Sequence, residues 1–346
     1  MLTPGPWRRS LVKYTFGLMA ERTRILSGMR PTGRFHLGNY LGAAQNWVQL
    51  QNEYECFYFV ADYHALTTEP DGHTVESKIF DLTADLIAVG IDPKRSVLYQ
   101  QSKVPEVAEL SLLLSMVTPL SWVQRTPTFK QMAKQHPDNV NLGLFSYPVL
   151  QGADIVIVKG VGVPVGKDQL AHVELVREIV RRFNRIYSPV FPEPRALLTQ
   201  TPHIRGTDGK QRMSKTVGNI VGVTEEAEVI RKQVMSMVTD TKRPRMTDPG
   251  HPRTCNVCAF YKFFFDDWQH YWDLCRRAKI GCAEKKKLLA DRMIEVFRPF
   301  REVRAELTPE AVNRILEEGS DKARTVARRT MVEVRDAVGL PPYSRT

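Results

Sequence analysis

Two short segments, far apart in the chain, carry the residue types best suited to binding a polyphosphate. The first, 27–39, has the sequence SGMRPTGRFHLGN, and the second, 209–216, has the sequence GKQRMSKT. Glycines let a ligand approach the backbone closely, while arginine, lysine and histidine supply donors and positive charge for phosphate oxygens. Neither segment is a P-loop or a dinucleotide-binding G-x-G-x-x-G. Taken alone, each is also compatible with a mobile surface loop.

The surrounding sequence predicts how the first segment is held. The apolar pair Ile25 and Leu26 precedes it as a strand, and a helical pattern from about Leu37 to Glu53 follows it. A strand, a tight turn and a helix start bring backbone N–H groups and the positive end of a helix dipole to one point. This arrangement favours an anionic ligand.

Strands and helices alternate through the next part of the chain. Short apolar runs predict buried parallel strands, and periodic stretches between them predict helices. The predicted strands are 55–62, 96–100 and 161–165, and the predicted helices are 75–89, most of 105–135, and 169–186. The alternation indicates an α/β fold with a doubly wound parallel (Rossmann-like) sheet. Polar residues follow two of these strands, at Asp62 and at 166–169, where open sheets of this kind bind ligands.

Three polar residues share one face of a further predicted helix. Tyr147, Gln151 and Asp154 recur at helical spacing among apolar neighbours. We expect this helix to begin near Tyr147, because Pro148 suits a first turn. The three side chains form either a buried structural network or a pocket for a ligand with a polar tip.

Strand patterns stop after residue 216. The helical patterns that follow cover 224–239, 256–273, 283–298, 309–318 and 321–337, which predicts an all-α domain. The last helix is rich in basic side chains: Lys322, Arg324, Arg328, Arg329 and Arg335. With a net charge of +11 and a pI near 9.4, the chain favours a polyanionic partner such as nucleic acid, and this helix is a candidate contact surface.

The length of 346 residues is enough for two domains. We place an N-terminal extension, expected to be flexible, at 1–22, a Rossmann-like domain with a helical insertion at 23–216, and a helical domain at 217–346. No apolar run is long enough to span a bilayer, and the apolar stretch near Phe16 is too short for a secretory signal.

Four of the five cysteines lie close together in the helical part. Cys255 and Cys258 form a C-x-x-C pair, and Cys275 and Cys282 form a C-x6-C pair. Such a cluster is compatible with a zinc or iron–sulfur site, but the spacing favours reduced thiols packed between helices. Cys56, alone in an apolar strand pattern, is expected to be a small buried hydrophobe.

Taken together and in this order, the HLGN sequence at 36–39 and the RMSKT sequence at 212–216 resemble the two signatures of class I aminoacyl-tRNA synthetases. Further stretches between Thr23 and Leu340, such as ADYHALT at 61–67 and PVGKDQ at 164–169, resemble the tryptophanyl-tRNA synthetases. The resemblance implies activation of L-tryptophan with ATP and Mg²⁺ to tryptophanyl-adenylate and pyrophosphate, then transfer of tryptophan to tRNA(Trp). It also implies a cytoplasmic homodimer whose helical domain binds the anticodon.

The resemblance assigns roles to individual residues. The implied catalytic residues are His36, Asn39, Arg212 and Lys215, with Lys215 the main stabiliser of the leaving pyrophosphate. The implied ATP-binding residues are Arg30, Pro31, Thr32, Gly38, Asn39, Gly166, Lys167, Asp168, Ile204, Arg212, Met213, Ser214, Lys215 and Thr216. The implied tryptophan-binding residues are Leu26, His64, Tyr147, Gln151, Asp154, Val163, Val165 and Gln169.

The chain departs from the family pattern at several positions. Arg212 and Thr216 replace the end residues of the usual KMSKS sequence but keep a positive charge and a hydroxyl group. Lys167 stands where the family often has an acid. Some members carry a four-iron cluster with a C-x6-C-x2-C ending, and this chain has Lys285 in place of the last cysteine.

Indole and phenol side chains require different pockets. An indole offers one N–H donor and no acceptor, which suits Asp154. The related tyrosine enzymes place a tyrosine in the first strand where this chain has Leu26, and an apolar residue there would leave a phenolic hydroxyl unpaired. The alternatives are a tyrosine-specific enzyme, a synthetase-like protein that binds tRNA without charging it, and a nucleotidyltransferase of the same fold.

Overall fold

A computed structural model describes residues 22–68, 74–126, 129, 137–198, 204–215 and 217–342. These residues form two compact units. The sheet unit contains the described parts of 22–34, 41–201 and 306–346, and the helical unit contains 35–40 and the described part of 202–305. The predicted N-terminal extension lies outside the described residues, apart from Arg22.

The sheet unit is built on five parallel strands in the order β3-β2-β1-β4-β5. The strands are β1 (Arg24–Met29), β2 (Glu55–Val60), β3 (Ser96–Gln100), β4 (Gly162–Val165) and β5 (Arg195–Leu198). The order runs outward from β1 in both directions, as in a doubly wound sheet, so the predicted fold class is confirmed. The first four strands coincide with predicted ones, whereas β5 was not predicted.

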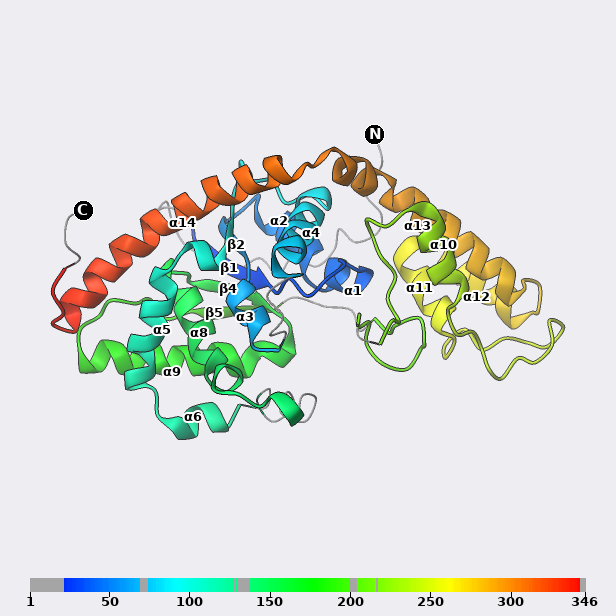
Figure 1. Ribbon diagram of the computed structural model, residues 1–346. Coiled ribbons are helices and arrows are strands. Elements are labelled where there is room, and N and C mark those ends of the chain that lie inside the picture. Colours follow the sequence, from blue (N-terminus) through cyan, green and yellow to red (C-terminus); the bar gives the residue numbers. More distant parts are fainter. Residues whose placement is uncertain are drawn as a thin grey trace. The chain divides into compact units, whose positions relative to one another are not determined.

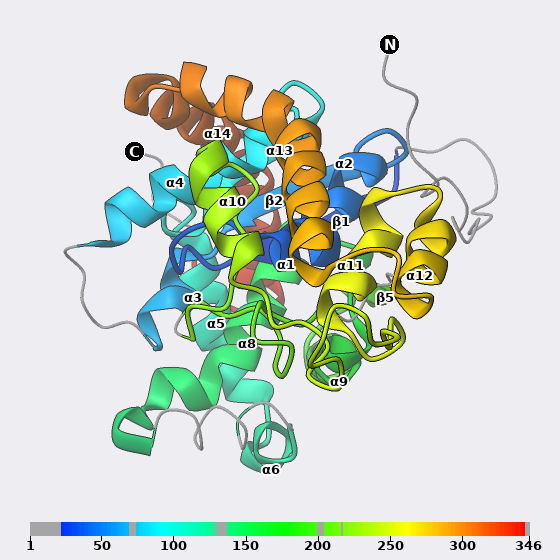
Figure 2. The same ribbon diagram turned by 90° about the vertical axis from the view of Figure 1, so that its right-hand side faces the viewer.

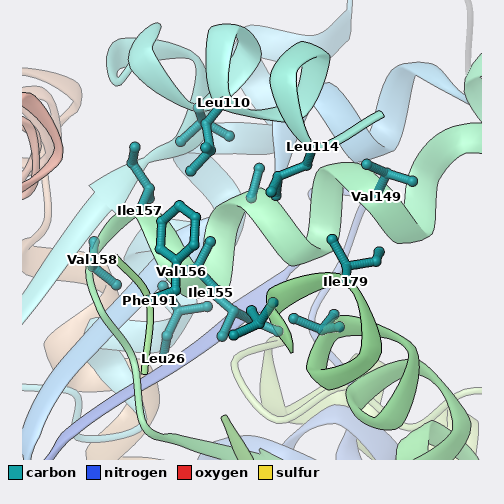
Figure 3. Close-up of a cluster of buried hydrophobic side chains, with 14 of the residues drawn as sticks. Leu26, Leu110, Leu114, Val149, Ile155, Val156, Ile157, Val158, Ile179 and Phe191 are labelled. Atoms are coloured by element: carbon teal, nitrogen blue, oxygen red, sulfur yellow. The ribbon is translucent and has the colours of Figure 1, made fainter. Parts of the chain in front are cut away.

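Alternate side chains of β2 pack on opposite faces of the sheet, as strand geometry requires. Tyr58 stacks on Trp47, with ring centroids 4.8 Å apart, whereas Phe57 and Phe59 join the largest apolar cluster. Figure 3 shows part of this cluster, in which Leu26 lies among side chains such as Ile155 and Phe191. Both faces of the sheet are therefore covered, which explains the continuous apolar character of the strands.

Helices of the sheet unit cover both faces and one edge. They are α2 (Gln45–Leu50), α3 (Asp62–Leu66), α4 (Val75–Ala88), α5 (Glu106–Val117), α6 (Leu120–Gln124), α8 (Leu142–Ile157), α9 (Leu170–Ile186) and α14 (Pro309–Ala337). Gly90, with a φ of 113°, lies just after the C-terminus of α4. This is the helix-ending role that was predicted for it. The predicted helix at 37–53 is interrupted: α1 (Leu37–Asn39) is followed by a π-helix, η2 (Tyr40–Ala44), before α2.

Helix α8 begins earlier than predicted. Its N-cap is Asn141, whose side chain accepts a hydrogen bond from the Leu144 N–H, so Pro148 lies inside the helix and not in its first turn. The predicted start at Tyr147 is wrong because the cap residue determines where a helix begins. The helical spacing of Tyr147, Gln151 and Asp154 is unaffected.

Helix α14 is one continuous helix, not the two that were predicted. The apparent break at Gly319 and Ser320 is a packing contact against β3, and Figure 1 shows α14 running along this edge of the sheet. A Cβ atom at Gly319 would lie 1.9 Å from the Leu98 carbonyl oxygen, and the Ser320 hydroxyl accepts from the Gln100 N–H at 3.3 Å. A small residue is needed because another backbone approaches so closely.

The predicted boundary of the helical domain therefore does not coincide with the compact units, since α14 belongs to the sheet unit. The basic residues of α14 are also partly engaged there. Arg324 and Arg328 donate to Glu106 of α5 at 2.8 and 3.2 Å, and Arg335 donates to Glu109. These contacts reduce the charge that α14 offers to a nucleic acid.

The helical unit contains α1, α10 (Ala227–Met235), α11 (Asn256–Phe264), α12 (Trp268–Arg276) and most of α13 (Cys282–Glu306). Helices α11 and α12 lie side by side, as Figure 2 shows. Apolar side chains such as Val257, Phe260 and Met293 are fully buried in this unit. Among the described residues, no helix is long and apolar enough to cross a membrane.

Candidate active site

The carboxyl ends of β1 and β4 bring several predicted site residues together within the sheet unit. These strands are neighbours in the sheet, and the chain leaves them in opposite directions, which is where doubly wound sheets bind ligands. Residues 30–33 follow β1, and Gly166 and η6 (Lys167–Gln169) follow β4. The structure thus brings the predicted residues Arg30, Pro31, Thr32, Gly166, Lys167, Asp168 and Gln169 to neighbouring strand ends.

The end of β1 and the turn after it approach their neighbours closely. A Cβ atom at Gly28 would lie 2.4 Å from the Phe59 ring, so only glycine fits there. The Thr32 N–H donates to the Arg30 carbonyl at 2.9 Å, and the Arg30 guanidinium donates to the Thr68 hydroxyl at 3.3 Å. Arg30 is exposed, so its positive charge is accessible to a ligand at this end of the sheet.

Asp154 is the buried polar centre of the sheet unit. Its side chain is 1% exposed and accepts from His64 Nε2 at 2.8 Å and from Gln101 Nε2 at 2.8 and 3.0 Å. Burial raises the pKa of Asp154, and the His64 and Gln101 contacts oppose that rise. His64 follows β2 and Gln101 follows β3, so the ends of two strands converge on one carboxylate of α8.

Tyr147 and its neighbours lie beside this centre. The Tyr147 hydroxyl is 3.0 Å from His172 Nε2 of α9, and its ring meets the His64 ring edge to face, with centroids 6.0 Å apart. Burial lowers the pKa of His172. The Gln151 Oε1 atom is buried and has no hydrogen-bond partner among the described residues. Tyr147 and Asp154 are therefore linked, because both contact His64. Gln151 is not part of this group, since its Oε1 atom makes no hydrogen bond to the described residues.

The apolar residues predicted for tryptophan binding lie in or against the core. Leu26 and Val163 are almost fully buried in the apolar cluster that also contains Ala153 and Ile155, the neighbours of Asp154 in α8, and Val165 packs against that cluster. Gln169 is half-buried, and its amide lies 3.4 Å from the Asp168 carboxylate. These positions are compatible with an apolar pocket wall beside Asp154.

In the helical unit, His36 caps the short helix α1. Its Nδ1 atom accepts from the Asn39 N–H at 3.3 Å, and its own N–H donates to Asn39 Oδ1 at 3.2 Å, which forms a reciprocal capping box. Burial and the charge of Lys215 lower the pKa of His36 to about 4. The imidazole is therefore neutral near pH 7, and because Nδ1 accepts, Nε2 carries the proton and can donate.

The two signature segments come together within this unit. His36 pairs with Gly222 in an antiparallel bridge, and the Leu37 N–H donates to the Val221 carbonyl at 2.8 Å. A Cβ atom at Gly38 would lie 3.4 Å from Met213 Cβ. The structure thus places the HLGN and RMSKT sequences against each other, with Thr216 outside the described residues.

Asn219, which was not predicted, holds the second segment. Its Oδ1 atom accepts from the Ser214 N–H at 2.7 Å, its amide donates to the Arg212 carbonyl at 3.2 Å, and its carbonyl accepts from the Thr207 N–H. A polar residue just after a basic loop was the only available signal for it. Ile204, predicted to lie near adenine, is buried at the start of this region.

The cysteine cluster does not fit the predicted metal site. Cys255, Cys258 and Cys275 are buried, and Cys282 is half-buried. The ammonium group of Lys285 lies 2.9 Å from Cys275 Sγ and 3.2 Å from Cys258 Sγ. Burial alone would lower the pKa of Lys285, but the neighbouring sulfurs raise it above its ordinary value.

A metal ion held by these sulfurs would bring a second positive charge beside a buried ammonium ion, which is unfavourable. Within the described part of the chain, no group of three or more His, Cys, Asp or Glu side chains is arranged to hold a metal ion. The set Cys255, Cys258, Cys275 and Cys282 therefore fits neither a zinc ion nor an iron–sulfur cluster.

Comparisons with known proteins cover most of the chain. The family described as "tRNA synthetases class I (W and Y)" matches residues 19–298. The tryptophan–tRNA ligase of Thermotoga maritima is 46% identical, over 92% of this chain and 99% of that protein. The tryptophan–tRNA ligase of Aquifex aeolicus is 41% identical, over 92% of this chain and 100% of that protein.

Solved structures give the same grouping. The Campylobacter jejuni tryptophanyl-tRNA synthetase complexed with ADP and tryptophan has a TM-score of 0.84 at 34% identity, covering 92% of this chain and 100% of that one. A tyrosyl-tRNA synthetase from Aeropyrum pernix has a TM-score of 0.64 at 18% identity, covering 86% of this chain and 89% of that one, a likeness of fold alone.

Proposed function

Because the chain belongs to the class I tRNA synthetases of the tryptophan and tyrosine group, we propose that it is a tryptophan–tRNA ligase. It activates L-tryptophan with ATP to tryptophanyl-adenylate and pyrophosphate, and it then transfers tryptophan to tRNA(Trp). The observation that carries this choice is similarity to tryptophan–tRNA ligases over nearly their whole length at 41% and 46% identity. The buried acceptor Asp154 and the apolar Leu26 agree with an indole ligand.

The chemistry requires positioning and charge neutralisation, not a covalent enzyme intermediate. An oxygen of the tryptophan carboxylate attacks the α-phosphorus of ATP, and the electron pair of the broken P–O bond leaves on pyrophosphate. Lys215 and Arg212 neutralise the charge that develops there. Mg²⁺ bound to the phosphates would neutralise part of the same charge. A hydroxyl of the terminal ribose of the tRNA then attacks the activated carbonyl, and AMP leaves.

The proposed ATP-binding roles follow the chemistry of each group. His36, as a neutral Nε2–H donor, binds a phosphate oxygen, and Arg30 contributes charge. Gly38 and Asn39 offer backbone and amide groups at the start of α1. Gly166, Lys167 and Asp168 bind the ribose, with the Asp168 carboxylate as acceptor for hydroxyl groups. Pro31, Thr32, Ile204, Met213, Ser214 and Thr216 complete the predicted set.

The proposed tryptophan-binding roles centre on the network of α8. Asp154 accepts the indole N–H, and Tyr147 and Gln169 bind the α-ammonium group. His64 and Gln151 supply further polar groups, while Leu26, Val163 and Val165 contact the ring. Cytoplasmic location and anticodon binding by the helical domain at 217–346 stay predictions.

Homodimer formation is part of the proposal. Leu112 and Met116 lie one turn apart on α5 and are 57% and 68% exposed, and Leu120 at the start of α6 is 63% exposed. Large apolar side chains so close together at the surface are typical of protein interfaces. A second copy of the chain is the partner that the family resemblance implies.

The experiment that tests the activity is amino-acid-dependent ATP–pyrophosphate exchange, with tryptophan and tyrosine assayed in parallel. We expect exchange with tryptophan and not with tyrosine. Exchange with tyrosine alone would contradict the assignment of an indole pocket, but it would still agree with membership of the family. Absence of exchange with either amino acid, in folded protein, would favour a tRNA-binding protein that does not charge.

A further inference from the structure

Gln101 is a fully buried glutamine whose side-chain orientation is fixed at both ends. Its Oε1 atom accepts from the Tyr63 N–H at 3.1 Å, and its Nε2 atom donates to both oxygens of Asp154, at 2.8 and 3.0 Å. A backbone N–H can only donate, so the amide oxygen must face Tyr63 and the NH₂ group must face Asp154. The orientation of the Gln101 amide is thus fixed, and its NH₂ group donates to the Asp154 carboxylate.

This donor matters because Asp154 has few neighbours that stabilise its charge. Among the described residues, His64 Nε2 is the other group within hydrogen-bond distance of Asp154. The negative charge of Asp62, at the start of α3, acts in the opposite direction and, like burial, raises the pKa of Asp154. The Tyr99 hydroxyl, which interacts electrostatically with Asp154, has no hydrogen-bond partner among the described residues.

The contacts of Gln101 and His64 do not exhaust the carboxylate. A carboxylate offers about four lone-pair positions, and in the described part of the chain the donors that contact Asp154 are two nitrogen atoms. At least one lone-pair position of the Asp154 carboxylate therefore has no donor among the described residues. Held as an ionised acceptor, Asp154 can accept an indole N–H, whereas a protonated carboxyl group would itself donate and could pair with an acceptor such as a phenol oxygen.

We propose that Gln101 is a positioning residue for tryptophan recognition, which holds the Asp154 carboxylate in one orientation and in its acceptor form. The proposal rests on the proposed function, since it assumes that Asp154 accepts the indole N–H. Gln101 does not itself contact the substrate in this scheme. Its effect is therefore expected in the recognition of tryptophan and not in the binding of ATP.

Two substitutions separate this role from a merely structural one. In Gln101→Leu the donor is lost at every pH, and we expect the KM for tryptophan to rise about 10- to 100-fold, the range for one hydrogen bond to a charged group. In Gln101→Glu two carboxyl groups face each other, and one of them takes up a proton as the pH falls. The protonated glutamic acid can then donate to Asp154 as the amide does.

The measurement is ATP–pyrophosphate exchange between about pH 6 and about pH 8.5, a range over which such a carboxyl pair can titrate. We expect the KM for tryptophan of Gln101→Glu, relative to that of the unchanged protein at the same pH, to approach the unchanged value as the pH falls. The ratio for Gln101→Leu should stay constant. The KM for ATP should change less than about twofold in both, and thermal unfolding confirms that each variant is folded.

Gln49→Glu is the control, because Gln49 lies at an exposed position of α2, where the same exchange of an amide for a carboxyl group takes place in water. We expect this variant to keep the KM for tryptophan and its pH dependence. A folded Gln101→Leu protein with an unchanged KM for tryptophan would overturn the inference, and so would pH-independent behaviour of Gln101→Glu. If the unchanged protein catalyses ATP–pyrophosphate exchange with tyrosine and not with tryptophan, the proposed function itself is wrong. That outcome does not depend on the Gln101 variants.

Discussion

The neutral state of His36 gives a stability difference with a definite sign. Its pKa is lowered from 6.5 to about 4 in the folded protein. Between these values the unfolded chain binds more protons than the folded one, so stability falls as the pH is lowered from about 6.5 towards 4. Fully expressed, a shift of this size corresponds to about 3–4 kcal/mol.

We therefore expect His36→Asn, which keeps a side chain suited to capping α1, to lose less stability than the unchanged protein when the pH falls from about 7 to about 4.5. Urea unfolding at the two pH values measures this. His270→Asn, at an exposed position of α12, is the control and should keep the original pH dependence. Equal pH dependence in His36→Asn and in the unchanged protein would contradict the assignment of a buried neutral imidazole.

Lys285 allows a second prediction at the level of single residues. Because the Lys285 ammonium group contacts Cys258 and Cys275, and its charge disfavours a cation at these sulfurs, we expect chelators to leave the thermal midpoint of unfolding unchanged. Lys285→Met should lower stability by about 1–3 kcal/mol, since the sulfurs lose a charged donor. Lys287→Met, at an exposed position of the same helix, should have little effect. Stoichiometric zinc or iron in the purified protein would refute this account.

Among the elements, α14 shows how one small residue decides where a helix packs. Gly319→Ala would place a methyl group against the Leu98 carbonyl, and because backbone cannot move aside cheaply, we expect a loss of about 1–3 kcal/mol. In an isolated helix the same change would be stabilising, so the sign itself reports the contact. Chemical unfolding measures it, with Glu318→Ala at an exposed position as the control. A more stable Gly319→Ala protein would show that α14 does not pack on β3 in this way.

For the whole molecule, the proposed dimer is the property that mutation can test most directly. Introducing charge at Leu112 and Met116 together, as Leu112→Glu and Met116→Glu, should convert a dimer to a monomer, because buried unpaired charges are costly at an interface. Light scattering coupled to size-exclusion chromatography measures the mass. Val332→Glu, at a residue of α14 that is 56% exposed, should leave the mass unchanged. An unchanged protein that is monomeric at micromolar concentration would exclude the dimer.

The sequence by itself determined the fold class, four of the five strands, most helices and the two signature segments. These features depend on local patterns: apolar runs for buried strands, helical periodicity, and short motifs such as HLGN. It also determined that polar groups follow β1, β2 and β4, because the carboxyl ends of parallel strands share one edge of a sheet.

Only the tertiary structure decided which of these groups meet. Gln101 reaches Asp154 across 53 positions of the chain, Lys285 reaches Cys258 across 27, and Gly319 owes its role to a strand more than two hundred positions away. The same residues look like an ordinary strand end, a surface lysine and a helix break when the sequence is considered alone. The physical reason is that burial and hydrogen-bond pairing depend on which elements pack together, and local patterns do not encode that.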